Sequence, residues 1–366
     1  MPTRWGVTFA LLLLALVSSF AAFVLGGHRV DPALPAGPGS PKPKVRLIAT
    51  GGTIANGTSG RLTAEELARM TSGLEGVAEV EAEQFSNTAS TALTLGHWLE
   101  LARRLNTVFE EDDRLAGVVV TTGTDTLEET AYFLNLTVRT DRPVVLVGSM
   151  RHPGDPDYDG AHNLLDGVRV AADPGSRGRG ALVVLNGEIN AAREVTKTDG
   201  LRLDSFKAGS GVLGAIDGER VGYYRRLTKR HSSASEFDVK RVQGLPRVDI
   251  VMVYQDASGD IIRTLADHGA QGIVIAAAGA GATSGSQDEG ISYAIEKGVS
   301  VVISSRTVTG RVPARTVQAF AVAGRAPDLT RIAAEDLPAV KARILLMLAL
   351  TVTKDRQEIQ RMFKEY

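Results

Sequence analysis

Two short turns that follow apolar runs carry the residues best suited to chemistry. Thr50 to Thr53 follow the run 45–49, and Thr122 to Asp125 follow the run 117–121. Each turn places threonine hydroxyls in a glycine-bearing loop beyond a predicted strand. In open α/β sheets, ligands bind in the crevice outside the carboxyl ends of the strands, and glycine lets backbone and ligand approach closely. The first hypothesis is therefore chemistry at a threonine hydroxyl.

A lysine and an aspartate complete a candidate catalytic set. Asp125 directly follows Thr124, and Lys197 lies in a further polar segment. An alcohol is a poor nucleophile and needs a base, which can be a lysine made neutral by burial or by cationic neighbours. Either turn alone would most often be structural, and Thr126 with Glu129 predicts a capping box for the helix that follows. The pair of turns together with the lysine indicates a hydrolase.

Longer strings surround these turns and continue along the chain. They are Ile48 to Ala55, Thr122 to Ala131, Arg142 to Arg151, Asn163 to Leu164, Val195 to Thr198 and Lys341 to Arg343. Together they resemble the motifs of exported, type II-like bacterial L-asparaginases of the asparaginase/glutaminase family, over nearly everything from Lys44 to Tyr366. Two long motifs in the right order are far more specific than a lone glycine pattern.

The resemblance implies a catalytic role for four residues. Thr53 would be the nucleophile that attacks the side-chain amide carbon of the substrate. Thr124 would be a second catalytic hydroxyl, activated by Lys197 and held near Asp125. The reaction implied is hydrolysis of L-asparagine to L-aspartate and ammonia, with weaker hydrolysis of glutamine.

The resemblance also implies how an amino-acid substrate is held. Asp125 would meet the α-ammonium group, and Ser90 would bind the α-carboxylate with Thr91 beside it in the same pocket. A zwitterionic substrate needs such a matched acceptor and donors. A hydrolase of another small amide, a glutaminase-asparaginase and a catalytically inactive amino-acid-binding homologue stay open as alternatives, because fold does not fix function.

Three features depart from the family pattern. The loop after Thr53 is short and has Arg61 about where relatives carry a tyrosine, and a solvated loop charge is the simpler interpretation. Ala280 stands where many relatives place an asparagine that reaches into a neighbouring subunit's site. The segment 310–317 has no counterpart of a glutamate that many relatives contribute across the interface. The family nevertheless implies a homotetramer with active sites at subunit contacts.

Composition excludes several function classes. The 366 residues include no cysteine, so disulfides, thiolate zinc sites and cysteine nucleophiles are excluded. The six histidines are scattered without metal-ligand spacing, and we expect no metal and no cofactor. Gly279 to Gly281 begin like a dinucleotide fingerprint, but Ser284 replaces the third glycine, so a strand-end loop is expected. A net charge of −1 gives no electrostatic footprint for nucleic acid.

Residues 1–43 are interpreted as a leader and linker. Arg4 precedes a mainly apolar run from Trp5 to Leu25, and five prolines follow in the stretch 31–44. A charged segment, an apolar core and a spacer are typical of a signal peptide. We expect a periplasmic or secreted protein. Because about 21 apolar residues can also span a bilayer, an uncleaved anchor is the alternative.

The remaining chain alternates strand-like and helix-like segments. Apolar runs predict strands at 45–49, 117–121, 143–147, 181–185, 248–253, 272–277 and 300–304, with amphipathic stretches between them. That alternation is typical of parallel α/β sheets. We predict two α/β domains, a larger N-terminal one with a parallel-type sheet (44–227) and a smaller C-terminal one (248–366), joined by a linker (228–247).

Overall fold

The computed structural model describes residues 41–314 and 330–366. The predicted leader and nearly all of its linker lie outside the described residues, as do positions 315–317 of the segment without the interface glutamate. Within the described ranges, no helix is long and apolar enough to cross a membrane.

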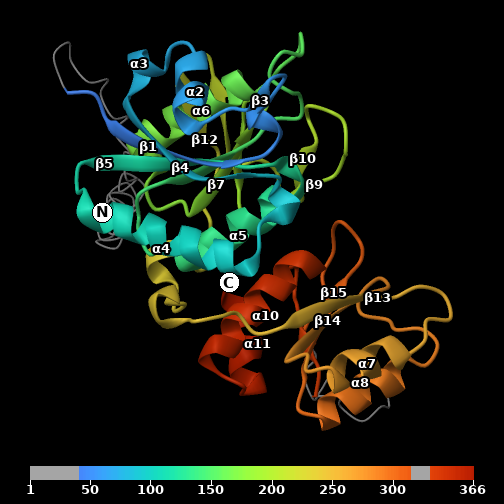
Figure 1. The fold of residues 1–366 in the computed structure, drawn as a ribbon. Coiled ribbons are helices and arrows are strands. Elements are labelled where there is room, and N and C mark those ends of the chain that lie inside the picture. The colour runs from blue at the N-terminus through green and yellow to red at the C-terminus, as the bar shows by residue number, and fades with distance from the viewer. Residues whose placement is uncertain (1–40, 315–329) are drawn as a thin grey trace, which may run out of the picture. The chain divides into compact units, whose positions relative to one another are not determined.

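An eight-stranded sheet organises the N-terminal domain (Figure 1). Its strand order is β12-β11-β8-β7-β6-β5-β1-β4. The strands from β7 to β4 run parallel, whereas β8, β11 and β12 pair antiparallel at the other edge. The strands are β1 (Lys44–Gly51), β4 (Glu79–Thr88), β5 (Leu115–Thr121), β6 (Val144–Val147), β7 (Ala181–Leu185), β8 (Glu188–Ala191), β11 (Gly214–Asp217) and β12 (Arg220–Tyr223).

Helices cover both faces of this sheet. On one face, Val118 and Val120 of β5 share a core with α4 and α5, and on the other, Val119 shares a core with α2, α3 and α6. Burial on both faces explains why the central strands are near-continuous apolar runs. The helices are α2 (Ala64–Met70), α3 (Leu74–Val77), α4 (Leu95–Glu111), α5 (Leu127–Thr137) and α6 (Gly160–Ala172).

The capping box predicted for Thr126 and Glu129 is wrong. Thr126 closes a 3-10 turn, η3 (Thr124–Thr126), that runs directly into α5. Its backbone (φ −121°, ψ 19°) is not the extended N-cap conformation, and its side chain accepts no capping hydrogen bond. The buried Thr126 hydroxyl has no hydrogen-bond partner among the described residues. A capping box does form at α2, between Thr63 and Glu66.

The C-terminal domain is built on a parallel sheet of four strands, β13-β14-β15-β16. α7 and α8 cover one face of it, and α10 packs against the other. α10 also packs against α5, so one apolar core runs from the first sheet to the second. The elements are β13 (Val248–Met252), α7 (Asp260–Asp267), β14 (Gly272–Ala277), α8 (Gln287–Glu296), β15 (Ser300–Ser305), β16 (Ile332–Ala333), α10 (Ala339–Val352) and α11 (Arg356–Glu365).

The predicted fold class is confirmed. The larger N-terminal domain has a mainly parallel sheet, and the smaller C-terminal domain is a second α/β unit. Each of the predicted strands is present with its ends shifted by at most two residues. The sequence did not predict β4 or the antiparallel strands β8, β11 and β12.

Candidate active site

Three loops meet at the carboxyl edge of the first sheet. β1 lies between β4 and β5, and all three run parallel, so their last residues reach the same edge. The loop after β1 carries Thr53, the loop after β5 carries Thr124 and Asp125, and the loop after β4 carries Ser90. Adjacent parallel strands therefore bring together residues that lie far apart in the sequence.

Glycines allow these loops to touch. Gly52 has φ 86°, a conformation that L side chains rarely adopt, and a Cβ on it would lie 2.2 Å from the backbone nitrogen of Gly123. A Cβ on Gly123 would in turn lie 2.8 Å from Ser90 Oγ. The amide of Gly52 also donates to the carbonyl of Thr88 at 2.8 Å. The two glycines of the motifs are thus required by the close contact between the loops.

A hydrogen bond from a distant tyrosine holds the turn that carries Thr53. Thr53 begins the 3-10 turn η1 (Thr53–Ala55), and the hydroxyl of Tyr158 donates to the carbonyl of Ile54 at 2.9 Å. Burial raises the pKa of Tyr158, so its hydroxyl stays a protonated donor. The chain then forms a tight hairpin of β2 (Asn56–Gly57) and β3 (Gly60–Arg61).

Lys197 reaches both residues that follow β5. It ends β9 (Val195–Lys197), which pairs antiparallel with β10 (Phe206–Ala208). Its Nζ donates to Thr124 Oγ1 at 2.9 Å and to Asp125 Oδ1 at 2.7 Å. The Lys197 side chain is only 14% exposed, whereas that of Asp125 is 69% exposed. The lysine is therefore shielded from solvent, as is its partner Thr124, whereas the Asp125 carboxylate is accessible.

A small cavity collects most of the predicted site residues. Its volume is about 130 Å³, below the roughly 300–1,000 Å³ of sites for drug-sized ligands, so it suits a small polar molecule. Thr91 is exposed and does not line it, and Lys197 lies behind Thr124. The lining residues are Gly52, Thr53, Asn56, Arg61, Ala89, Ser90, Gly123, Thr124 and Asp125.

Two lining residues and one supporting residue were not predicted. Asn56 and Arg61 come from the hairpin after the first turn and line the cavity. Behind it, Glu128 accepts from the Thr196 hydroxyl at 2.9 Å and from the backbone amide of Lys197 at 3.1 Å. No sequence signal marks Glu128 as a partner of β9, because the contact joins residues about 70 positions apart.

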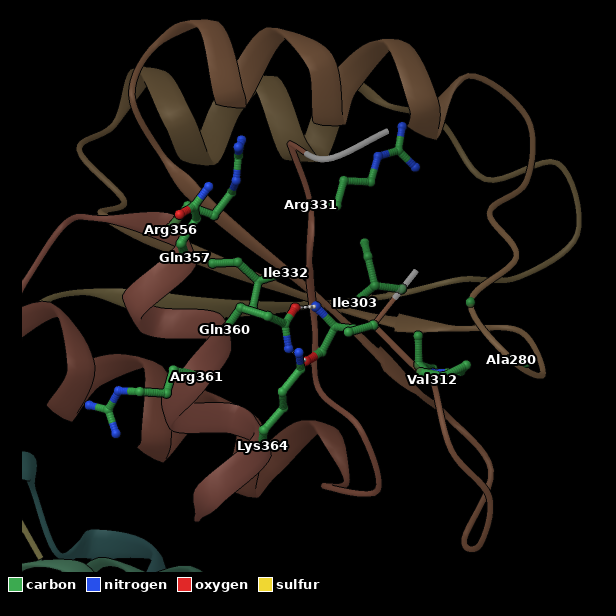
Figure 2. A pocket seen from close by; sticks show the side chains of 14 residues that line it. Ala280, Ile303, Val312, Arg331, Ile332, Arg356, Gln357, Gln360, Arg361 and Lys364 are labelled. Carbon is green, nitrogen blue, oxygen red and sulfur yellow. Dashed lines mark hydrogen bonds between the residues drawn. The ribbon is translucent and has the colours of Figure 1, made fainter. Parts of the chain in front are cut away.

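Figure 2 shows a larger cavity, of about 450 Å³, in the C-terminal domain. Arg356, Gln360 and Lys364 of α11 line it, together with Ala280 and β16. The Gln360 amide accepts from the backbone nitrogen of Ala333 at 2.8 Å and donates to its carbonyl at 3.1 Å. The described lining contains no hydroxyl and no carboxylate side chain. The chemistry expected from the sequence therefore belongs to the smaller cavity.

No metal centre is found in the described part of the chain, where no three or more His, Cys, Asp or Glu side chains cluster suitably. The hydroxyl of Thr53, a second hydroxyl bound to a lysine, and an accessible carboxylate instead surround one small cavity. Such a set can carry out acyl transfer through a covalent intermediate.

Comparison with known proteins gives matches over most of the chain. The family model described as Asparaginase, N-terminal matches residues 44–229, and the model of the Glutaminase/Asparaginase C-terminal domain matches residues 247–363. L-asparaginase 2 of Bacillus subtilis is 42% identical over 335 residues, which are 88% of this chain and 87% of that protein. L-asparaginase 2 of Escherichia coli is 39% identical over 359 residues, 95% and 98% of the two chains.

Two further relatives differ in the activity or location that their names state. The Glutaminase-asparaginase of Pseudomonas fluorescens is 38% identical over 88% of this chain and 90% of its own. The crystal structure of the "Probable Cytoplasmic L-asparaginase" from Campylobacter jejuni superposes with a TM-score of 0.83 at 39% identity, covering 89% of this chain and 100% of that one. By its two family-model matches and these relatives, the chain belongs to the asparaginase family.

Proposed function

We propose that this protein is an L-asparaginase that hydrolyses L-asparagine to L-aspartate and ammonia through a threonine nucleophile. The observation that carries the proposal is the contact of Lys197 Nζ with Thr124 Oγ1 and Asp125 Oδ1 beside the cavity that Thr53 lines. Membership of the asparaginase family supports the same reaction.

Thr53 is the proposed nucleophile. Its Oγ forms an ester with the side-chain carbonyl carbon of the substrate, the C–N bond breaks, and the nitrogen leaves as ammonia after it gains a proton. Water then cleaves the ester, which releases aspartate and restores the hydroxyl. Splitting one difficult step into two easier ones is the usual advantage of covalent catalysis.

Lys197 and Thr124 are proposed to handle the protons. Lys197 Nζ lies 2.9 Å from Thr124 Oγ1 and 2.7 Å from Asp125 Oδ1. In its neutral form the lysine can accept a proton through the Thr124 hydroxyl, because the two groups are within hydrogen-bond reach.

Asp125 and Ser90 are the proposed anchors of the substrate. Asp125 is exposed toward the cavity and carries the charge that an α-ammonium requires. Ser90 lines the same cavity and offers a hydroxyl donor to the α-carboxylate. Thr91 is proposed only as a neighbour of that carboxylate, because the residue is exposed and does not line the cavity.

The test is ammonia release by three single variants. Thr53→Ala, Thr124→Val and Lys197→Met should each lower kcat by at least about 10²-fold, the scale of one acid–base contribution. Thr53→Ser serves as the control, because it keeps a hydroxyl at the same position. If the folded Thr53→Ala and Thr124→Val variants turned over asparagine like the wild type, the mechanism would be wrong.

Glutamine hydrolysis is the second candidate activity, favoured by the similarity to the Pseudomonas fluorescens glutaminase-asparaginase. Asparagine and glutamine differ by one methylene, which a pocket discriminates by about 10–200-fold. We expect asparagine to be preferred in kcat/KM, with glutamine turnover detectable. Equal or better turnover of glutamine would make the protein a glutaminase-asparaginase. Binding of either amino acid without turnover would make it an inactive binding homologue.

We further propose that the protein works outside the cytoplasm as a homotetramer, with each site at the contact with a neighbour's C-terminal domain. Exposed apolar side chains on the edge strand β13 and just after it support self-association, since Ile250, Met252 and Tyr254 are 37%, 59% and 59% exposed. The leader-like sequence 1–43 supports export, as does a relative from Haemophilus influenzae whose name places it in the periplasm. An uncleaved leader would instead anchor the protein at the membrane.

Two measurements test assembly and export. Size-exclusion chromatography at assay concentration should give a tetramer, and a fully active monomer would refute the shared site. Fractionation of the native host should recover a shortened chain outside the cytoplasm. Full-length chain in the membrane fraction would indicate the anchor, and full-length chain in the cytosol would refute export.

A further inference from the structure

A fully buried lysine lies behind the candidate site. Lys341 is on the first turn of α10, in the C-terminal domain, and its residue is 0% exposed. Its Nζ donates to the carbonyl of Arg193 at 3.1 Å and to the carbonyl of Val195, and it lies 3.8 Å from Glu128 Oε2. A buried charge persists only when its partners compensate for the water it has lost, so these contacts need an explanation.

Glu128 connects Lys341 to β9, the strand that ends in Lys197. It lies on the first turn of α5, three residues after Asp125, and is almost fully buried. Its Oε2 accepts from the Thr196 hydroxyl at 2.9 Å and its Oε1 from the Lys197 amide at 3.1 Å. Both carboxylate oxygens are therefore used on β9.

β9 depends on these two side chains. Among the described residues, it pairs with β10 along one edge only. Along the rest of its length, Lys341 binds the carbonyl of Val195, and Glu128 binds the next two residues. Each residue of the strand that ends in Lys197 is thus bound by Lys341 or Glu128.

Glu128 is also close in the sequence to Thr124 and Asp125, the two residues that Lys197 contacts. Thr124 and Asp125 lie in the 3-10 turn that runs directly into α5, where Glu128 sits. One rigid helix start therefore carries Thr124 and also holds the backbone of Lys197. The 2.9 Å distance between Lys197 Nζ and Thr124 Oγ1 therefore depends on the hydrogen bonds between Glu128 and β9.

We propose that Glu128 and Lys341 are positioning residues, a buried pair that holds β9 so that Lys197 stays within hydrogen-bond reach of Thr124. The inference rests on the proposed function of Thr124 and Lys197. It also gives the C-terminal domain a role in the site of its own chain, because Lys341 acts from α10. Burial lowers the pKa of Lys341 to about 8, an effect that the Glu128 carboxylate opposes.

A purely structural pair would change stability and leave the folded enzyme's turnover intact. A positioning pair changes kcat, since a displacement of about 1 Å in a catalytic group can cost about 10²-fold. The KM should change less than kcat, because the proposed anchors Ser90 and Asp125 lie on other elements than β9, and of these two Lys197 contacts only Asp125. The split between kcat and KM therefore distinguishes the two roles.

The first experiment removes one hydroxyl. Thr196→Val deletes the donor to Glu128 while keeping the shape of the side chain, and we expect kcat for asparagine to fall about 10-fold or more with KM within about twofold. Thr196→Ser restores the hydroxyl and should restore kcat. Thr137→Val is the matched control, because it removes a buried threonine hydroxyl at the far end of α5, where it bonds the Phe133 carbonyl. Its kcat should equal that of the wild type.

The second experiment addresses the charged pair, where a single change can prevent folding. Lys341→Met alone leaves Glu128 buried without its cation, whereas Glu128→Gln/Lys341→Met removes both charges and should melt at a higher temperature than Lys341→Met. Its kcat should nevertheless stay low, because a glutamine has only one acceptor oxygen for the two donors of β9.

The outcomes separate this inference from the proposed function. Wild-type kcat in both Thr196→Val and the double variant, with Thr124→Val inactive, would overturn the positioning role and leave the proposed function standing. An equal loss of kcat in Thr137→Val would also overturn it, because the effect would then be general. An active Thr124→Val variant would refute the proposed function itself.

Discussion

The contact between Gly52 and Gly123 makes a strong prediction about Gly52→Ala. Gly52 has φ 86° and ψ −176°, a region of backbone conformation that is essentially restricted to glycine and costs other residues about 1–3 kcal/mol. The new Cβ would lie 2.2 Å from the backbone nitrogen and 2.4 Å from the Cα of Gly123. Ordinary van der Waals contact begins near 3.4 Å, so the two loops must separate by about 1 Å.

The expected magnitudes follow from these two effects. Backbone strain and overpacking, each about 1–3 kcal/mol, should lower the free energy of unfolding by about 2–6 kcal/mol in total. Because the displaced Gly123 directly precedes Thr124, kcat should also fall by about 10²-fold, the cost of a misplacement of this size. Urea unfolding and ammonia release under saturating asparagine measure the two quantities separately.

Gly298→Ala is the matched control for backbone strain. Gly298 has φ 83°, and no heavy atom would lie within 4 Å of a Cβ added to it. It follows α8 in the C-terminal domain, away from the candidate site. The control should lose only the strain contribution of about 1–3 kcal/mol and keep wild-type kcat. Wild-type turnover by Gly52→Ala would refute the argument that loop contact positions Thr53 and Thr124 for the proposed reaction.

Three further predictions concern other parts of the chain. Arg61→Gln removes a cation from the cavity lining and should raise the steady-state KM for asparagine about fivefold, the effect of roughly 1 kcal/mol. Arg61→Lys keeps the charge and should change KM less. An unchanged KM in Arg61→Gln would make Arg61 a solvated loop charge. The Arg193 guanidinium lowers the pKa of Asp336 from 3.8 to about 2, so the charged pair stabilises the fold above pH 3.8 and this contribution is lost as pH falls through 2. In urea unfolding at pH 5, the free energy of unfolding of the wild type should exceed that of Asp336→Asn by about 1 kcal/mol, after allowance for a half-exposed carboxylate, and the difference should vanish below pH 2. Tyr158→Phe leaves the Ile54 carbonyl without its hydroxyl donor and should lower the free energy of unfolding by about 1 kcal/mol in thermal melts. The kcat should also fall, because η1 carries Thr53. An unchanged melting temperature would contradict the proposed role of this hydrogen bond.

The sequence predicts the strands that are buried on both faces and misses those at the edges. β1, β5, β6 and β7 are continuous apolar runs because helices cover both sides of the sheet. β4 has the sequence EVEAEQFSNT, and two of its glutamates, Glu81 and Glu83, pair with arginine or lysine at the sheet edge. Such a strand has no apolar run to detect, because its side chains make ion pairs where a central strand makes a core.

Local motifs failed where a neighbouring turn changed the backbone. Thr126 and Glu129 have the spacing of a capping box, but the 3-10 turn that presents Thr124 continues into α5 and removes the extended N-cap residue. The geometry that places Thr124 beside Lys197 is therefore also the reason that the box does not form. A capping box inferred from residue spacing alone takes no account of the backbone conformation that a neighbouring turn imposes on the N-cap residue.

Some residues of the candidate site can be predicted from local sequence, and others depend on contacts between distant parts of the chain. Thr53, Thr124 and Asp125 could be predicted because each lies in the turn after a strand, and parallel strands place such turns on one edge. Glu128 and Lys341 could not, because their importance depends on contacts about 70 and 145 residues away in the sequence. Arg61 was read as a solvated loop charge, yet a tight hairpin brings it to the cavity.

The position of Lys197 shows why both kinds of information are needed. Its motif predicts a polar residue near the site, but β9 is a strand of only three residues, paired on one edge and short of the hydrogen bonds that hold a longer strand. The missing bonds come from a carboxylate on α5 and an ammonium on α10. A buried ion pair is weak evidence for stability, so the pair of Glu128 and Lys341 beneath β9 is better explained by placement of Lys197, the proposed base, than by stability alone.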